Sequence, residues 1–442
     1  MKRYAFLITF LTVIFPISQQ SKAQTPDGTL TLEKIWTIAA RQNRQLQLAD
    51  LSLKESHISI QEARDKRLPN LSIAGNYSLN SKFLVYDKGL FSKPQDVPVS
   101  GYGYGFGYGL DFNLYSGGRE KRNINMKEEE QHRRQIEFEL QEDNVKYMIA
   151  TVYYDLYKYL QFQDFISAEI ATEKKQLTTI HSLHKNGVVL KSDVLRTSVK
   201  LSQLELSFSD LAKKIELAKQ HLNILMGRNE EEPLEIPYKD TVNLEGIKQS
   251  GYSDYVALAL HQSPAFKIAS SDIKLGELNV SQAKSALLPK ISLYSNYNYT
   301  YPQVSFYPYS NAPWSYGQTG VRMQFSIDHL YKSKHSIAHA RNLHDQQKEK
   351  ANIKKNDISI QVKEAYLQQK QALESVATAE ENIAQSTETV RVISNSYLHQ
   401  ESLLRDLLDA ENVLLEAKFN LIAAQVNLKL SHIRLLAITG IL

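Results

Sequence analysis

The sequence predicts a mainly α-helical protein that also contributes β-strands to a membrane, built as two tandem repeats. The first observation is that two stretches, from Gly118 to Gly187 and from Gly320 to Gly440, contain neither glycine nor proline between their ends. Helices can therefore run unbroken over roughly 65 residues, close to ~100 Å, which is longer than ordinary globular domains contain. The other two observations are an internal repeat and a segment that alternates with period two.

Composition and charge exclude several classes of protein. With 42% hydrophobic and 23% charged residues, the 442-residue chain is neither disordered nor collagen-like, and it is too polar for a multispanning helical membrane protein. The formal net charge of +4 is too small to indicate a nucleic-acid-binding protein, so no nucleic acid is expected as a partner. The sequence has no cysteine, which excludes disulfides, thiolate zinc sites and cysteine nucleophiles.

The amino terminus has the layout of a secretory signal peptide over residues 1–23. Lys2 and Arg3 precede an apolar run from Tyr4 to Ile17, and small residues precede the expected cleavage before Gln24. A membrane anchor is the weaker alternative, because the apolar run is too short to span a bilayer. No later stretch approaches about 18 uninterrupted apolar residues, so we expect an exported protein without transmembrane helices.

The internal repeat is visible in two blocks. The Leu-Pro pair at Leu68 is matched by the pair at Leu288, each before a strand-like segment, and a leucine-rich block that begins at Leu190 recurs at Leu403. Through each of these later blocks, apolar residues recur at every seventh position, which is typical of coiled-coil packing.

These signals divide the chain into parts. We expect a first repeat over 24–227, an inter-repeat linker over 228–250 and a second repeat over 251–442. Each repeat is expected to hold an entry helix, two strands (about 71–85 and 101–115, then 291–301 and 315–327) and two long helices (119–183 and 189–227, then 332–396 and 403–439).

Period-two alternation predicts the membrane strands. From Gly101 to Gly109 every second residue is glycine, and the alternate positions are apolar and mostly aromatic. An apolar face opposite a small or polar face is what a membrane barrel strand needs, since lipid lies on one side and water on the other. Arg322 in the last strand would point into the water-filled lumen. The residues expected to face lipid are Tyr102, Tyr104, Phe106 and Tyr108.

Four strands from one chain cannot close a barrel. An open sheet edge in hydrocarbon would leave backbone groups unpaired, so several chains must share one barrel. Because closure needs roughly eight strands or more, assemblies with about eight, twelve or sixteen strands all remain open at this point. The competing interpretation is a soluble β-domain on a coiled-coil stalk.

Several motifs resemble the TolC family of outer-membrane efflux proteins, also called outer membrane factors, over essentially the whole mature chain. They are the tandem halves, the Leu-Pro entry into each first strand, the turn from Leu114 to Arg119 into a long helix, and the two helix-hairpin tips. The second copy of the turn departs from the pattern, because Asp328 to Tyr331 replace its glycine pair.

The resemblance implies a homotrimer whose chains share a 12-stranded β-barrel in the outer membrane, on an α-helical tunnel in the periplasm. It implies a passive exit duct of a tripartite efflux or type I secretion system, without a cofactor. A periplasmic adaptor (membrane fusion) protein would couple the duct to an inner-membrane pump of RND, ABC or related type. The alternative is a non-transporting structural protein of the cell envelope. Drugs, metal ions and secreted polypeptides all remain open as cargo.

The resemblance also places a gate at the periplasmic helix tips. Asp406 and Asp409 are three residues apart on a helix, so three copies would form two acidic rings that favour cations. The alternative is ordinary helix-start chemistry, in which an aspartate is stabilised by the helix dipole. The gate residues carried over from the family are Asp406, Asp409, Tyr397, Asp193 and Ser192.

The two tips are also the expected docking surface for the adaptor. Gly187 is expected to adopt a positive φ, and the apolar residues after it are expected to be exposed. Gln400 and Ser402 stand where the family has glycine and arginine, so a latch built on that arginine would differ here. The docking residues are Gly187, Val188, Val189, Leu190, Gln400, Glu401, Ser402 and Leu403.

No enzymatic motif accompanies these features. The sequence lacks a Gly-x-Ser-x-Gly elbow, a phosphate loop and a His-Glu-x-x-His motif. His335 with His339, and His181 with His184, have metal-compatible spacing, but no cysteine or clustered carboxylate supports them, so solvated helix faces are the better interpretation. We therefore expect neither an enzyme nor a metal site.

Overall fold

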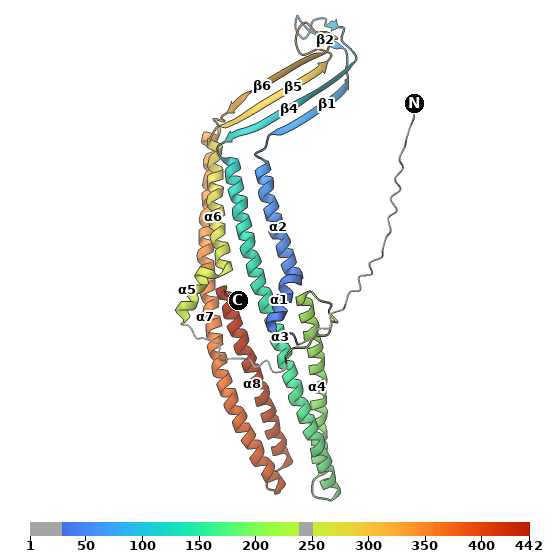
Figure 1. Ribbon diagram of the computed structural model, residues 1–442, viewed down its shortest axis with the longest axis vertical. Coiled ribbons are helices and arrows are strands. Elements are labelled where there is room, and N and C mark those ends of the chain that lie inside the picture. Colours follow the sequence, from blue (N-terminus) through green and yellow to red (C-terminus); the bar gives the residue numbers. More distant parts are fainter. Residues whose placement is uncertain (1–28, 238–250) are drawn as a thin grey trace, which may run out of the picture.

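The molecule is an elongated body of helices with a β-sheet at one end (Figure 1). The computed structural model describes residues 29–237 and 251–442. The expected signal peptide, and residues 238–250 of the expected linker, lie outside the described residues.

Four long helices form most of the body, and α3 alone has 67 residues, about 100 Å of helix. The long helices are α3 (Arg119–Lys185), α4 (Lys191–Met226), α7 (His329–Leu398) and α8 (Leu404–Thr439). The shorter ones are α1 (Leu32–Gln42), α2 (Arg44–Asp65), α5 (Tyr252–Gln262) and α6 (Pro264–Lys284), followed by the single turn η1 (Ser285–Leu287). A segment without glycine or proline can form such a long helix because every residue can donate its backbone N–H to the carbonyl four residues earlier.

The packing order of the helices leaves two free edges. Near the sheet, α2 packs on α3, α3 on α6 and α6 on α7. Toward the far end, α4 packs on α3, α3 on α8 and α8 on α7 (Figure 1). One edge of the body is therefore made by α2 and α4, and the other by α7.

The sheet has four antiparallel strands in the order β1-β4-β5-β6. They are β1 (Asn70–Leu79), β4 (Tyr102–Ser116), β5 (Lys290–Tyr301) and β6 (Trp314–Gln324). Register places Tyr104 opposite both Tyr77 and Tyr301, and Tyr108 opposite Ile73 and Tyr297, so the aromatic positions share one face. The outer strands β1 and β6 each have one unpaired edge in this chain.

Two strand ends differ from the sequence prediction. The strand expected at 71–85 ends at Leu79, and Phe83–Val85 forms a separate strand, β2, paired with β3 (Gln95–Val97). Just beyond β1 the N–H of Asn80 still donates to the carbonyl of Gly101 (2.9 Å), and next to it the N–H of Ser100 donates to the side chain of Asn311 (2.6 Å). The last strand, expected to reach 327, ends at Gln324, and a turn at 327–328 leads into α7, which begins at His329.

The largest apolar core lies in the middle of the body, where α1 packs against α3 and α4. Ile35, Ile149 and Tyr153 are fully buried there, and the indole N–H of Trp36 donates to the carbonyl of Lys146 (2.9 Å). Leu234, from the first part of the expected linker, is buried in the same core. This core joins both pairs of long helices, since α8 also contributes to it.

Helix α8 is the one described helix that is long and apolar enough to cross a membrane by composition alone. It packs along α7 and α3 instead, and its apolar residues contribute to the buried clusters of the body. The apolar character of α8 is therefore explained by helix packing.

Asp143 on α3 gives a first testable prediction. Burial raises the pKa of Asp143 from 3.8 to about 6, opposed by the charge of Lys146 and aided by the charges of Glu142 and Glu139. The folded state therefore holds the proton more tightly than the unfolded chain, and it loses stability as the pH rises from about 4 to about 6. We expect Asp143→Asn to stabilise the protein by about 1 kcal/mol at pH 7.5, after allowance for solvent screening of a half-buried group, and by much less at pH 4. Thermal unfolding at the two pH values checks this, and an equal shift at both would contradict it.

Candidate functional site

The end of the body farthest from the sheet is formed by two helical turns, 186–190 between α3 and α4 and 399–403 between α7 and α8 (Figure 1). A buried apolar cluster joins the two turns, and Tyr397 and Val189 pack around it. We call this region the tip cluster. Its buried members are Ile180, Val194, Leu404, Leu407 and Leu408.

Both turns have the same backbone geometry. In the first, the N–H of Val188 donates to the carbonyl of Leu183 (2.9 Å), and in the second the N–H of Glu401 donates to that of Ser396 (2.8 Å). Each turn needs one residue in the left-handed region, which is Gly187 (φ 77°) in the first and Gln400 (φ 63°) in the second. A side chain in this conformation costs roughly 1–2 kcal/mol, so the second turn is strained.

The strain at the second turn predicts a stabilising substitution. We expect Gln400→Gly to raise the free energy of unfolding by about 0.5–1 kcal/mol, because relief of strain exceeds the entropy that glycine adds to the unfolded chain. Gly187→Gln is the matched control and should lower stability by about 1 kcal/mol. Thermal unfolding, with hydrogen exchange at residues 396–404, measures both effects, and shifts of the same sign would contradict the prediction.

Asp193 and Asp406 occupy equivalent positions in the first turns of α4 and α8. The carboxylate of Asp193 accepts a hydrogen bond from the N–H of Leu190 (3.2 Å), and that of Asp406 accepts one from the N–H of Leu403 (3.4 Å). Both aspartates therefore lie at the third position of their helices and cap the first turn.

Asp406 and Asp409 also share a second setting, because both line a groove of about 620 Å³ between α7 and α8. Glu416 lines the same groove, with Asn382, Gln385, Thr389 and Asn420. The Nε of Arg405 lies 3.7 Å from the carboxylate of Asp406 and 4.0 Å from that of Asp409, on the same helix. Since these groups are exposed, the pairing contributes little, and the groove keeps an acidic character.

Tyr397 connects the second tip electrostatically to the first. Burial, followed by the charge of Asp193, raises the pKa of Tyr397. Its buried hydroxyl has no hydrogen-bond partner among the residues that the structure describes. Ser192 is exposed beside Asp193, and the hydroxyl of Ser402 donates to the carbonyl of Ile393 (3.3 Å). The five expected gate residues thus lie at the two tips, although they do not form one hydrogen-bonded network.

The apolar residues of the turns divide into exposed and packed. Leu190 is 71% exposed, Leu403 67% and Val188 52%. The expectation that Val189 is exposed is wrong, because its side chain packs against the tip cluster. Glu401 is exposed as well. An exposed apolar surface therefore remains on both turns, made chiefly by two leucines.

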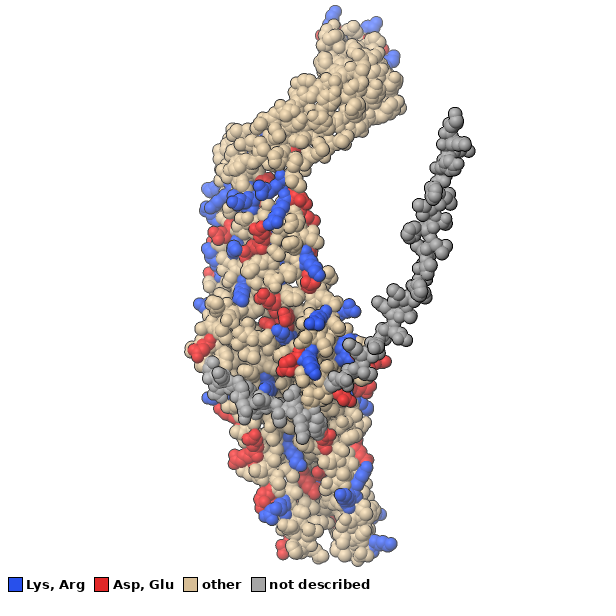
Figure 2. Space-filling model, in the orientation of Figure 1, with Lys and Arg blue, Asp and Glu red and all other residues tan. Residues whose placement is uncertain are grey.

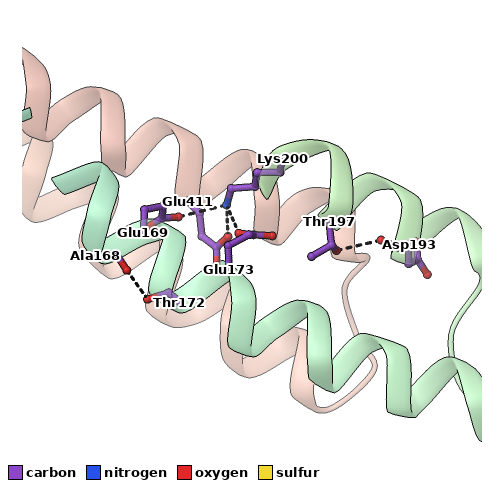
Figure 3. A network of polar contacts seen from close by, with 8 residues as sticks. All are labelled: Ala168, Glu169, Thr172, Glu173, Asp193, Thr197, Lys200 and Glu411. Atoms are coloured by element: carbon purple, nitrogen blue, oxygen red, sulfur yellow. Dashed lines mark hydrogen bonds and ion pairs between the residues drawn. The ribbon is translucent and has the colours of Figure 1, made fainter. Parts of the chain in front are cut away.

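One lysine and three glutamates form a buried ionic cluster that the sequence did not predict (Figure 3). The ammonium Nζ of Lys200 on α4 lies 2.6 Å from Glu411 on α8, and 3.0 Å and 3.3 Å from Glu173 and Glu169 on α3. Lys200 is only 7% exposed, and it occupies one of the inward positions that are otherwise apolar or uncharged along α4. A charged residue at such a position was the signal available in the sequence.

The histidine pairs lie on solvent-exposed helix faces. His335, His339, His181 and His184 are all exposed, and the ring Nδ1 of His184 lies 3.0 Å from the carbonyl oxygen of Val189. Within residues 29–237 and 251–442, the carboxylates of the buried ionic cluster are the one group with metal-compatible spacing. The ammonium of Lys200 already lies among them.

The sheet presents the expected apolar face. Tyr102, Tyr104, Phe106 and Tyr108 are between 39% and 58% exposed and follow one side of β4. The opposite side is polar, and there the guanidinium of Arg322 lies 4.7 Å from the ring of Tyr294. On the side seen in Figure 2, charged residues cover the helical body and the loop end, while the sheet between them is almost free of charge.

Comparison with known proteins agrees with this architecture. Residues 255–441 match the family described as outer membrane efflux protein. None of the curated protein sequences compared with the chain matches it.

Solved structures match over nearly the whole chain. The outer membrane protein VceC from Vibrio cholerae has 16% sequence identity and a TM-score of 0.75, over 92% of this chain and 96% of its own. The CmeC outer membrane channel of Campylobacter jejuni has 13% identity and a TM-score of 0.77, over 99% and 94%. The MtrE outer membrane channel of Neisseria gonorrhoeae, solved in an open state, has 16% identity and a TM-score of 0.73, over 92% and 88%.

At these identities the structures establish the fold, and the family match covers the second half of the chain. Together they agree with the resemblance drawn from the Leu-Pro entries and the hairpin tips. Residues 255–441 are thus similar to the outer membrane efflux protein family, and the chain as a whole has the fold of solved outer membrane channels.

Proposed function

We propose that three copies of this chain form a passive exit duct, with a shared 12-stranded barrel in the outer membrane and a helical tunnel in the periplasm. The duct is gated at the helix tips and receives cargo from an inner-membrane pump through a periplasmic adaptor. The observation that carries the proposal is that the chain has two free edges that can pair with each other in neighbouring copies. One edge is formed by β1, α2 and α4, and the other by β6 and α7.

The sheet supplies the first part of these edges. β1 and β6 each leave one row of backbone groups unpaired within the chain. In a membrane these groups must be paired, because neither water nor lipid can satisfy them there. Pairing the β1 edge of one copy with the β6 edge of the next supplies the missing hydrogen bonds at both.

The helices continue the same edges with exposed apolar side chains. On α4, Leu206, Leu217 and Ile224 are at least 50% exposed, and α7 exposes Ile353 and Ile360 at a seven-residue spacing on the opposite edge. Such stripes are what two helices bury against each other in a coiled coil. A head-to-tail ring of copies buries both edges, and three copies supply twelve strands.

Gating is proposed at the tips because the acidic groove and the junction between the two hairpins lie there. Three copies would bring Asp406 and Asp409 around a common axis, where carboxylate rings favour cations. Outward movement of α7 and α8 would widen the opening, and it would break the contacts of Tyr397 and Leu404 with the first hairpin.

The adaptor is expected to bind the exposed leucines of the turns. We expect the double variant Leu190→Glu with Leu403→Glu to reduce cross-linking to the adaptor at least about tenfold, because charge on both turns prevents burial of the apolar surface. Phe91→Glu is the matched control, since Phe91 is fully exposed at the opposite, loop end of the molecule. Undiminished cross-linking in a trimeric double variant would place the docking surface elsewhere.

The proposed function as a whole is tested with mature protein in planar bilayers, with the molecular mass of the assembly measured in the same preparation. A trimer with small, cation-selective openings supports a gated duct. A monomer, or a trimer without conductance under any condition, supports a structural protein of the cell envelope.

A further inference from the structure

The buried ionic cluster connects parts of the chain that the proposed gating would separate. Glu169 and Glu173 belong to α3, Lys200 to α4 and Glu411 to α8, so the ammonium of one helix holds carboxylates of two others (Figure 3). Glu411 follows Asp409 by two positions on α8. The contact between Lys200 and Glu411 therefore ties the start of the groove-lining helix to the first hairpin.

The cluster is short of positive charge. Three carboxylates surround one ammonium, and one oxygen of each carboxylate lies within 4.8 Å of one oxygen of the other two. Glu173 is completely buried, and its Oε1 has no hydrogen-bond partner among the described residues. Burial, together with the neighbouring carboxylates, raises the pKa of Glu173 and that of Glu411, so these two carboxyl groups hold a proton more readily than they would in water.

We infer that Lys200 locks the closed duct by holding α8 against the first hairpin, and that the cluster takes up a proton when the hairpins come together and releases it when they part. This inference rests on the proposed opening by movement of α7 and α8. It assigns to Lys200 a positioning role, since the lysine lies away from the groove that the gate aspartates line.

The distribution of partners makes the lock reversible. When α8 moves away, Glu411 enters water, whereas Glu169 and Glu173 remain beside Lys200 because all three belong to the first hairpin. The ammonium is therefore never left buried without a partner, which is the costly outcome of breaking a buried ion pair. The two α3 carboxylates act as its partners in the open state.

The direction of the pH dependence follows from the same contacts. Burial is the largest influence on Glu411, followed by Lys200 and Glu169, and the pKa of Glu411 is raised above 4.5. Burial also raises the pKa of Glu173, against the pull of Lys200. The pKa of Lys200 is raised from 10.5 by Glu411 and Glu173, against its own burial. The charges that act most on Glu411 come from α4 and α3, namely Lys200 and Glu169.

These shifts favour the closed state in acid. A carboxyl group whose pKa is higher in the closed state stabilises that state below its ordinary value of 4.5, and the stabilisation is lost as the pH rises through the raised pKa. Lys200 stays charged in both states until the pH exceeds about 10.5, so it adds no dependence below that value. Opening therefore becomes easier as the pH rises above about 4.5.

Removal of the ammonium tests the lock. We expect Lys200→Met to raise the ratio of open to closed channels about tenfold or more at pH 7.5, because the remaining carboxylates repel one another. Lys214→Met is the matched control, since Lys214 lies on the same helix but pairs with Asp210 of that helix (2.7 Å) at the surface. Single-channel currents of folded trimers give the ratio for each variant, and the control should match the wild type.

Removal of the Glu411 carboxylate tests whether proton uptake by the cluster causes the pH dependence of opening. Glu411→Gln keeps an acceptor for Lys200 but cannot bind or release a proton. We expect the wild-type ratio to rise about tenfold from pH 5 to pH 8, and Glu411→Gln to lose most of that rise. The variant Asp406→Ala with Asp409→Ala should keep the rise, which separates the cluster from the groove carboxylates.

The outcomes distinguish this inference from the proposed function. If Lys200→Met trimers open like the wild type while the double aspartate variant changes conductance, the lock is overturned and the gated duct stands. If no variant conducts, the duct itself is overturned. If Lys200→Met does not assemble, Glu411→Gln decides, because an unchanged pH profile in that variant overturns the lock.

Discussion

The double variant Asp406→Ala with Asp409→Ala is expected to conduct at least about twice as much as the wild type and to lose much of its preference for cations. In the proposed trimer the double variant removes six carboxylates from the proposed gate, and rings of carboxylates are what select cations in pores. Both aspartates line the same groove, so their effects should combine in the double variant. Single-channel conductance and reversal potentials in asymmetric salt measure the two effects.

This variant needs a control, because Asp406 also stabilises the start of α8 through its hydrogen bond with the N–H of Leu403. Asp254 makes the same bond at the start of α5, where its carboxylate accepts from the N–H of Gly251 (3.1 Å). Asp254→Ala should therefore cost about 1 kcal/mol of stability and leave the conductance unchanged. If Asp406→Ala with Asp409→Ala also leaves both conductance and selectivity unchanged, the acidic-ring proposal fails.

The second large effect is expected in the sheet, where Gly107→Ala should prevent assembly of the trimer. A Cβ at this position would overlap the backbone carbonyl oxygen of Tyr297 and lie 2.6 Å from the side-chain oxygen of Asn298. That carbonyl belongs to the β4–β5 pairing and cannot move without loss of ladder hydrogen bonds, so we expect a cost of about 3 kcal/mol. The yield of trimer inserted in membranes, measured by mass, should fall at least about tenfold.

A matched glycine on the same strand serves as the control. At Gly109 the nearest atom to an added Cβ is the hydroxyl of Ser72, at 3.2 Å, and this side chain can rotate away. Gly109→Ala should therefore assemble nearly as well as the wild type. Equal yields for the two variants would show that the glycine face of β4 tolerates side chains, contrary to the packing described here.

The periodic parts of this fold could be predicted from the sequence. Long helices follow from the absence of glycine and proline, and the alternation after Gly101 places Tyr104 and Tyr108 on one face of β4. The early end of β1 at Leu79 was not predicted from the sequence, nor was the bond between Ser100 and Asn311 close to it, which joins residues more than 200 positions apart. A local pattern contains no information about such a contact.

The candidate site was predictable to a similar extent. Asp406 and Asp409 lie on one side of their helix because three residues make nearly one helical turn. The burial of Val189 depends on which way the turn faces the tip cluster, which spacing does not determine. Lys200 was visible as a charge at an inward position, but its partners Glu173 and Glu411 come from two other helices and required the three-dimensional structure.

The complementary edges of the chain also determine how the proposed duct would assemble from separate chains. Two joined copies still expose one β1 edge and one β6 edge. An open row of any number of copies exposes the same two edges, so adding copies without closing the ring does not reduce the number of unpaired edges. Only the contact that closes the ring removes the last two edges together. Formation of the duct should therefore be steeply cooperative in the concentration of newly exported chains, with few dimers at equilibrium, and a peptide that copies β1 should block it by occupying β6.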